Sequence, residues 1–292
     1  MPPAMPSTVR EWQRGGRWVH TAAGRLFVRT VPGGEPVVVF LHGYPSSSYD
    51  FRHLIGRIGD HACIAIDLLG FGLSDKPRPH RYSIFEHADL VERLIAVEVG
   101  ERPVDIVAHD MGTSVATELM ARDVNGALGF RLRRVVLSNA GIIIERASLR
   151  PIQRLLLSPL GWTAARLANR PMFTREFARL FSPGHPLDPA EAAAQWALIS
   201  RAGGHRIAHL LCHYVRERAE HADRWHGAIR DWPGPLGFIW GLRDPVATVH
   251  VLDGLRELRP SAPVIKLPDL GHYPQIEDPA AFTAGVLSLL GG

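Results

Sequence analysis

Short runs of mainly hydrophobic residues alternate with amphipathic segments over the first half of the chain. The runs predict buried strands at residues 36–41, 62–67, 104–107 and 134–138, and a pair of shorter strands at residues 17–20 and 26–30. The amphipathic segments predict helices at residues 49–58, 83–98 and 113–122, and Ser83 and Glu86 have the spacing of a capping box. Because strands that alternate with helices form parallel sheets covered by helices on both faces, this pattern predicts an α/β fold.

The pattern changes from about residue 142 to residue 229. This stretch contains only helical segments interrupted by prolines, whereas strands return at residues 236–240 and 263–267 and a helix closes the chain at residues 279–290. We therefore predict an α/β core made of residues 1–141 and 231–292, with an inserted helical cap at residues 142–230.

Composition and charge argue against several classes of protein. The chain has 292 residues, of which 33 are basic and 29 acidic, and the resulting net charge of +4 is dispersed rather than clustered, so we expect no nucleic-acid partner. The first residues lack the hydrophobic core of a signal peptide, and we find no stretch long enough to span a membrane. Two isolated cysteines form no disulfide framework. We expect a cytoplasmic monomer or homodimer.

The segment from residue 104 to 112, VDIVAHDMG, has the layout of a nucleophile elbow. Such an elbow is a sharp turn from a strand into a helix that holds one side chain above the sheet. In the usual G-x-S-x-G pattern that residue is a serine, and here it is Asp110, with Ala108 and Gly112 as the small neighbours. The alternative is that Asp110 only caps the following helix, a position that aspartate favours.

Two more polar residues follow strands in the second half of the core. Asp244 comes after the strand at residues 236–240, and His272 comes after the strand at residues 263–267. Singly, Asp244 before Pro245 fits a turn, and His272 fits an exposed loop. Ligands bind at the carboxyl ends of parallel strands, however, so Asp110, Asp244 and His272 are expected to meet there as nucleophile, acid and base. This chain order is that of the α/β hydrolases.

Five motifs occur in the order found in one branch of that superfamily. They are His42-Gly43-Tyr44-Pro45, Gly70-Phe71-Gly72, His109-Asp110-Met111-Gly112, Asp244-Pro245 and Gly271-His272. With them the chain resembles the aspartate-nucleophile α/β hydrolases, which include epoxide hydrolases and haloalkane dehalogenases. Within that branch it resembles the mesoderm-specific transcript protein family, in residues 67–86, 137–141 and 272–279.

The resemblance implies a role for each site residue. Asp110 would attack a carbon atom and form an ester, and His272, oriented by Asp244, would activate the water that hydrolyses this ester. The backbone N–H groups of Tyr44 and Met111 would form the oxyanion hole. The remaining expected pocket residues are His42, His109 and Tyr273, although Tyr273 could also belong to the core.

The expected leaving group separates the possible activities. Haloalkane dehalogenases usually carry a halide-binding tryptophan after the nucleophile and often an asparagine in the His-Gly-x-Pro motif, whereas this chain has Met111 and Tyr44 there. Epoxide hydrolases usually carry two cap tyrosines that donate a proton, and the inserted stretch contains one, Tyr214. We therefore predict an epoxide hydrolase that acts on a small apolar epoxide, with Tyr214 as the acid. A dehalogenase, an esterase or a non-enzymatic binding protein remain alternatives.

Three histidines in the inserted stretch suggest one further alternative. His205, His209 and His213 are spaced by four residues, so on a helix they would share one face, as metal ligands can. No carboxylate or cysteine completes the set, and we expect neither a metal nor another cofactor.

Overall fold

A single mixed sheet of eight strands organises residues 5–291, the part of the chain that the computed structural model describes. The strands are β1 (Gly16–Thr21), β2 (Gly24–Val31), β3 (Gly34–Leu41), β4 (His61–Ile66), β5 (Val104–His109), β6 (Leu132–Ser138), β7 (Leu236–Gly241) and β8 (Val264–Leu267). Their order in the sheet is β1-β2-β4-β3-β5-β6-β7-β8, and all neighbours from β4 to β8 are parallel. The predicted α/β class is confirmed. Residues 1–4 and 292 of the predicted core lie outside the described residues.

The central strands are hydrophobic on both sides because helices cover both faces of the sheet. In β3, Val37, Val39 and Leu41 join one hydrophobic core, whereas Val38 and Phe40 join the other. The first core is completed by α2 (Ile84–Val99), α3 (Met111–Val124), α10 (Ala222–Asp231) and α11 (Val249–Leu258). The second is completed by α1 (Ser7–Arg14) and α13 (Pro279–Leu290).

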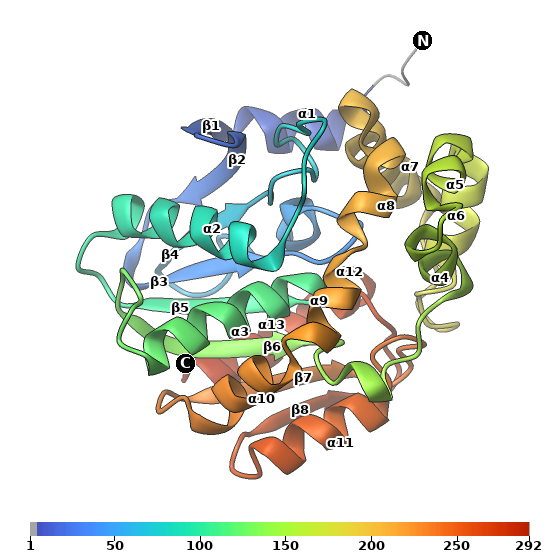
Figure 1. Cartoon of the computed structure of the whole chain (residues 1–292). Helices are drawn as coiled ribbons and strands as arrows, with labels where there is room; N and C mark the ends of the chain where they lie inside the picture. Colours follow the sequence, from blue (N-terminus) through green and yellow to red (C-terminus); the bar gives the residue numbers. More distant parts are fainter. Residues whose placement is uncertain (1–4, 292) are drawn as a thin grey trace.

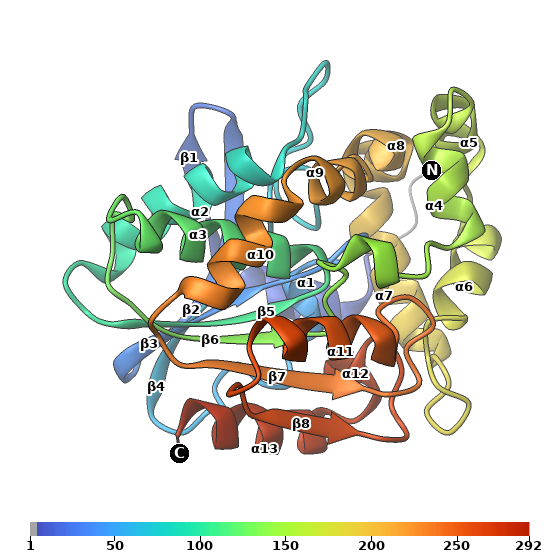
Figure 2. The same ribbon diagram turned by 60° about the horizontal axis from the view of Figure 1, so that its bottom comes forward.

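The stretch between β6 and β7 contains the remaining large group of helices, and we refer to it as the cap. Its elements are η2 (Ile144–Arg146), α4 (Pro151–Leu157), α5 (Gly161–Leu167), α6 (Arg170–Ala178), α7 (Pro189–Ser200), η3 (Arg201–Ile207), α8 (Ala208–Leu211), α9 (Tyr214–Glu220) and α10. Figures 1 and 2 both show α4, α5 and α6 grouped at one end of the sheet, and Figure 2 shows the arrowhead of β7 directed toward them. The cap therefore lies over the edge where the parallel strands end.

The structure differs from the sequence prediction at three local points. The segment 49–58 forms only the short 3-10 helix η1 (Ser48–Phe51) followed by turns, and Gly56 has a φ of 80° that ends any regular helix. Helix α1 was not predicted, although Val9 and Trp12 bury its hydrophobic face. The Ser83 side chain does cap α2, accepting a hydrogen bond from the N–H of Phe85. Glu86 does not complete a capping box, because its carboxylate contacts His80 at 2.8 Å.

Helix α3 packs directly against the end of β3, and Gly112 makes this approach possible. A Cβ atom at position 112 would lie 2.3 Å from the carbonyl oxygen of Leu41 and 2.6 Å from that of His42. Backbone atoms cannot rotate away as a side chain can. The elbow glycine is therefore required by the packing of the helix on the strand.

We predict that Gly112→Ala lowers the free energy of unfolding by about 1–3 kcal/mol, because the added methyl group must push α3 away from β3. Urea unfolding followed by circular dichroism measures this. Gly184→Ala is the matched control, since a Cβ there meets nothing within 4 Å. Equal stability of the two variants would contradict the packing described for the elbow.

Candidate active site

Asp110 lies at the junction of β5 and α3 in a strained backbone conformation. Its φ and ψ are 43° and −112°, a region that costs a residue with a side chain about 1–3 kcal/mol. The turn is held by backbone hydrogen bonds, since the N–H of Asp110 donates to Ser138 O at the end of β6 (3.2 Å) and its carbonyl accepts from the N–H of Thr113 (3.1 Å). Within the described residues the carboxylate makes no capping hydrogen bond to α3. Helix capping therefore does not account for an aspartate at this position.

The loop after β3 supplies a hydrogen-bond donor to this carboxylate. The N–H of Tyr44 donates to Asp110 Oδ2 at 2.9 Å. The two segments approach so closely that a Cβ on Gly43 would lie 2.7 Å from the Cβ of Asp110, so only glycine fits there. Met111 is the first residue of α3, and N–H groups in the first turn of a helix have no partner within the helix. Of the two predicted oxyanion-hole donors, Tyr44 therefore contacts Asp110 from a distant loop, and Met111 follows it directly in the chain.

His272 and Asp244 form a hydrogen-bonded pair at the ends of the neighbouring strands. Nδ1 of His272 lies 2.6 Å from Asp244 Oδ2. This contact orients the ring and leaves its other nitrogen, Nε2, available for proton transfer. Asp244 Oδ1 accepts hydrogen bonds from the N–H groups of Val246 and Ala247. Both side chains are buried. Asp110 and His272 line the same cavity, so the structure brings the three predicted triad residues to one site.

The pKa shifts of this pair follow from burial and charge. Burial lowers the pKa of His272, but the charge of Asp244, their hydrogen bond and the smaller effects of Asp110 and Glu277 together raise it more, so it lies above 6.5. Burial raises the pKa of Asp244, but the charge and hydrogen bond of His272 lower it more, so it lies below the ordinary value. Asp244 is therefore ionised at neutral pH, and His272 is neutral only above its own raised pKa.

Asn139 connects the ends of β6 and β7, and although it lies in the segment 137–141 that carries the family resemblance, it was not predicted as a site residue. Its Nδ2 donates to Asp244 Oδ2 at 2.7 Å, and its Oδ1 accepts from the N–H of Gly241 at 3.1 Å. Asn139 follows β6 directly and has a φ of 44°, which asparagine tolerates well. Its position at a strand end is the signal that could have revealed it, as it revealed Asp110 and Asp244.

The cap places a buried cation beside Asp110, which the sequence also did not reveal. Nη2 of Arg218, in α9, donates to the carbonyl oxygen of Asp110 at 2.8 Å and lies 3.5 Å from its Oδ1. Nε of Arg218 donates to Ser114 at 2.9 Å, and its guanidinium lies 4.6 Å from the centre of the Tyr214 ring. Only 3% of the Arg218 side chain is exposed. A buried pair of this kind neutralises the charge of the carboxylate.

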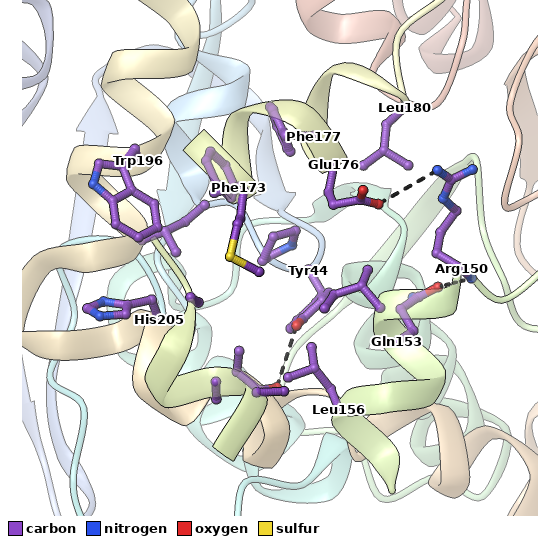
Figure 3. Close-up of a pocket in the computed structure, with 18 of the residues that line it drawn as sticks. Tyr44, Arg150, Gln153, Leu156, Phe173, Glu176, Phe177, Leu180, Trp196 and His205 are labelled. Atoms are coloured by element: carbon purple, nitrogen blue, oxygen red, sulfur yellow. Dashed lines mark hydrogen bonds and ion pairs between the residues drawn. The ribbon is translucent and has the colours of Figure 1, made fainter. Parts of the chain in front are cut away.

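A cavity of about 160 Å³ extends from Asp110 and His272 into the cap. Its wall comes from α4 to α8 on the cap side and is mainly hydrophobic, with large side chains from Leu156, Met172, Phe173, Phe177, Leu180 and Trp196. Figure 3 shows Tyr44 near the middle of this wall, His205 toward one end, and Arg150 with Glu176 toward the other. The cavity is therefore suited to a small apolar molecule with a polar group at one end.

Tyr44, rather than Tyr214, contributes its phenol to this wall. Tyr214 is 3% exposed and lies behind Tyr44, with the two ring centres 5.7 Å apart. The hydroxyl of Tyr214 accepts a hydrogen bond from Gln153 at 3.3 Å, so it is not at the surface. Burial raises the pKa of both phenols well above 10, which keeps them protonated at neutral pH.

The three other residues predicted to line the pocket lie under it instead. His42 Nε2 accepts from the N–H of Leu68, so its Nδ1 carries the proton and donates to Gly43 O. His109 Nε2 lies 2.7 Å from His272 O, and burial lowers the pKa of His109 to about 4, so the ring is a neutral donor. The hydroxyl of Tyr273 donates to Tyr44 O. All three are fully buried and support the loops around Asp110.

Neither a metal site nor a membrane span occurs among the described residues. In residues 5–291, no group of three or more histidine, cysteine or acidic side chains is placed to hold a metal ion, and His205, His209 and His213 form no such group. Over the same residues, no helix is long and apolar enough to cross a membrane.

Comparison with known proteins agrees with this geometry. Residues 36–279 match the family model described as the alpha/beta hydrolase fold. The chain belongs to the α/β hydrolase fold family. LipZ of Mycobacterium tuberculosis is 62% identical over 283 residues, which are 97% of this chain and 98% of LipZ. The mesoderm-specific transcript protein of Mus musculus is 35% identical over 295 residues, covering 96% of this chain and 87% of the mouse protein.

The same fold is seen in solved structures. The haloalkane dehalogenase DbeA from Bradyrhizobium elkani superimposes with a TM-score of 0.78 at 24% identity, covering 94% of this chain and 97% of that one. Membership of this family identifies the protein as a hydrolase. The predicted fold and the predicted resemblance to the mesoderm-specific transcript proteins are both confirmed.

We predict that the His272 ring titrates above pH 6.5, because the nearby carboxylates, Asp244 above all, outweigh its burial. In Asp244→Asn the charge is lost while burial remains, so the midpoint should fall below 6.5. NMR titration of histidine-labelled protein measures both. Asp269→Asn serves as the control, since 72% of the Asp269 side chain is exposed. A wild-type midpoint below 6.5 would contradict the described coupling.

Proposed function

We propose that this α/β hydrolase converts epoxides to vicinal diols through an ester formed on Asp110. The observation that carries the proposal is a carboxylate at the nucleophile position, with one oxygen bound by the N–H of Tyr44, that shares an apolar cavity with the His272–Asp244 pair. A carboxylate attacks saturated carbon atoms that bear a leaving oxygen, and strain makes the epoxide ring such a target. LipZ and the mouse mesoderm-specific transcript protein match this chain over almost its whole length, which supports a hydrolase of this fold.

In the first step, an oxygen of Asp110 attacks one epoxide carbon, and the bond from that carbon to the ring oxygen breaks. The developing alkoxide takes a proton from a phenol, and the phenol of Tyr44 is our preferred donor because it lines the cavity. Tyr214, which the sequence had suggested as the acid, packs behind it and would support its position. Both phenols are protonated at neutral pH, so position rather than protonation state favours Tyr44 as the donor.

In the second step, neutral His272 takes a proton from water, and the resulting hydroxide attacks the ester carbon of Asp110. The oxyanion formed there would be stabilised by the N–H groups of Tyr44 and Met111, and one such donor typically contributes roughly 3–4 kcal/mol. The diol then leaves with the original carboxylate oxygen, which takes the proton held by His272, and the proton of the new carboxyl group returns to the phenolate. The oxygen from water therefore remains on Asp110. Since His272 must be neutral, the rate should fall as the pH drops through its raised pKa.

The remaining functions have less support. A dehalogenase would need donors for a halide ion, and Met111 and Tyr44 stand where such enzymes usually carry tryptophan and asparagine. An esterase of this fold would normally use a serine in place of Asp110. A non-enzymatic binding protein would form no ester on Asp110.

The first test is diol formation from small terminal and cyclic epoxides, with Asp110→Ala as the blank. We expect diol from the wild type and none from the variant. In His272→Gln the ester should form and persist, and intact-mass spectrometry should detect it as the mass of one epoxide added to the protein. A single turnover in ¹⁸O-labelled water should label Asp110 rather than the diol. Diol formation that survives in Asp110→Ala would overturn the mechanism.

A second test separates the two phenols. Tyr44→Phe keeps the backbone N–H that binds Asp110 but removes the proton donor, so we expect the single-turnover rate of ester formation to fall by about 10²–10⁴. Tyr214→Phe should have a much smaller effect. The opposite ranking would restore Tyr214 as the acid, and two unaffected variants would exclude proton donation by either phenol.

A further inference from the structure

The cavity wall contains one arginine, Arg150, whose ion pair with Glu176 is long and is shared with a second arginine. Nη2 of Arg150 lies 3.9 Å from Oε2 of Glu176, which is longer than a hydrogen bond. The other carboxylate oxygen of Glu176 lies 2.5 Å from Nη1 of Arg179. The guanidinium of Arg150 makes no hydrogen bond to any residue that the structure describes, and 23% of its side chain is exposed. Glu176 therefore holds Arg179 closely and Arg150 only loosely, and Arg150 still has hydrogen-bond donors to offer to another anion.

Arg150 is also fixed in place at the cavity wall. Its backbone N–H donates to Oε1 of Gln153 at 2.8 Å, and Gln153 in turn donates to the hydroxyl of Tyr214. Pro151 follows and restricts the backbone at the start of α4. Figure 3 shows the Arg150 side chain extending along the wall toward Glu176. A ligand that binds this guanidinium therefore meets a side chain whose backbone needs little reordering.

The charges around the cavity favour an anion despite the presence of two carboxylates. Asp110 is paired with Arg218, and Glu176 with Arg179. Three guanidinium groups therefore share two carboxylates, and the charge of Arg150, the one arginine of the three that lines the cavity, is only partly compensated by Glu176. In a wall of low dielectric constant a cation with only a distant counter-ion is costly, and an incoming anion lowers that cost.

We propose that the substrate carries a carboxylate, which Arg150 binds while the electrophilic carbon lies at Asp110. This rests on the proposed function and deepens it by naming the substrate class. A guanidinium matches a carboxylate through two parallel hydrogen bonds, which sets the orientation of the bound molecule. The volume of about 160 Å³ compares with the roughly 150 Å³ that holds benzene in an apolar cavity. The remainder of the substrate is then a short hydrocarbon chain or one ring.

Binding can be tested without turnover. Hexanoate and hexanamide have the same shape and differ in charge, so isothermal titration calorimetry with the whole protein at neutral pH isolates the contribution of the anion. We expect hexanoate to bind about tenfold more tightly than hexanamide or better, as one charged hydrogen-bonded pair would give. Arg150→Gln should remove the difference, and Glu176→Gln should increase it. Arg154→Gln is the matched control, because that arginine is exposed on the same helix.

Equal binding of the two probes by the wild type would overturn the proposal, as would a preference that survives in folded Arg150→Gln protein. Circular dichroism melting establishes that each variant is folded.

A kinetic test distinguishes failure of this proposal from failure of the proposed function. The substrates are a hexanoate with a terminal epoxide and the corresponding amide. We expect the acid to have a KM about tenfold lower, with the advantage lost in Arg150→Gln and retained in Arg154→Gln. Asp110-dependent turnover of both compounds without preference would overturn the carboxylate site alone. Arg150-dependent binding of hexanoate without turnover of either epoxide would leave the anion site standing and overturn the epoxide hydrolase assignment.

Discussion

The structure depends on holding a carboxylate in a turn that its backbone does not favour. The φ of 43° at Asp110 costs free energy that must be recovered from its surroundings. Hydrogen bonds reach this one residue from distant segments of the chain: its N–H binds Ser138 at the end of β6, its carboxylate binds the loop after β3, and its carbonyl binds Arg218 in the cap. The strained turn at the nucleophile is thus bound directly to the cap through Arg218.

Electrostatics at this residue must satisfy two opposing demands. A buried carboxylate without a counter-ion is costly, but a strong hydrogen bond to its attacking oxygen would reduce its reactivity. Arg218 meets both demands, because its 2.8 Å hydrogen bond goes to the carbonyl oxygen of Asp110, whereas Oδ1 lies 3.5 Å away. The cation therefore balances the charge without occupying the carboxylate at hydrogen-bond distance.

The sequence predicted the core well, because the physical signals there are local. Buried strands appear as hydrophobic runs, and parallel strands end at one edge of a sheet, so the chain positions of Asp110, Asp244 and His272 suffice to predict that they meet. Arg150 and Arg218 could not be found in this way. They are two of many arginines in helical segments without a distinctive spacing, and only the packing of the cap determines which ones face the cavity or the nucleophile. The same holds for His42, His109 and Tyr273, whose motifs predict closeness to Asp110 but not the side from which each approaches it.

The cap divides into two parts with different constraints. Helices α9 and α10 are attached to the core, since Arg218 binds Asp110 while Arg224 and Trp225 bind the buried carboxylate of Glu118 in α3. Helix α7 also binds the core, because Gln195 donates to Asp50, whereas α4 to α6 mainly form the cavity wall. Substitutions in α4 to α6 can therefore reshape the space available to a substrate while the contacts that position the nucleophile stay intact. Such a division allows proteins with the same reaction centre to diverge in the substrates they bind, with little loss of folding stability.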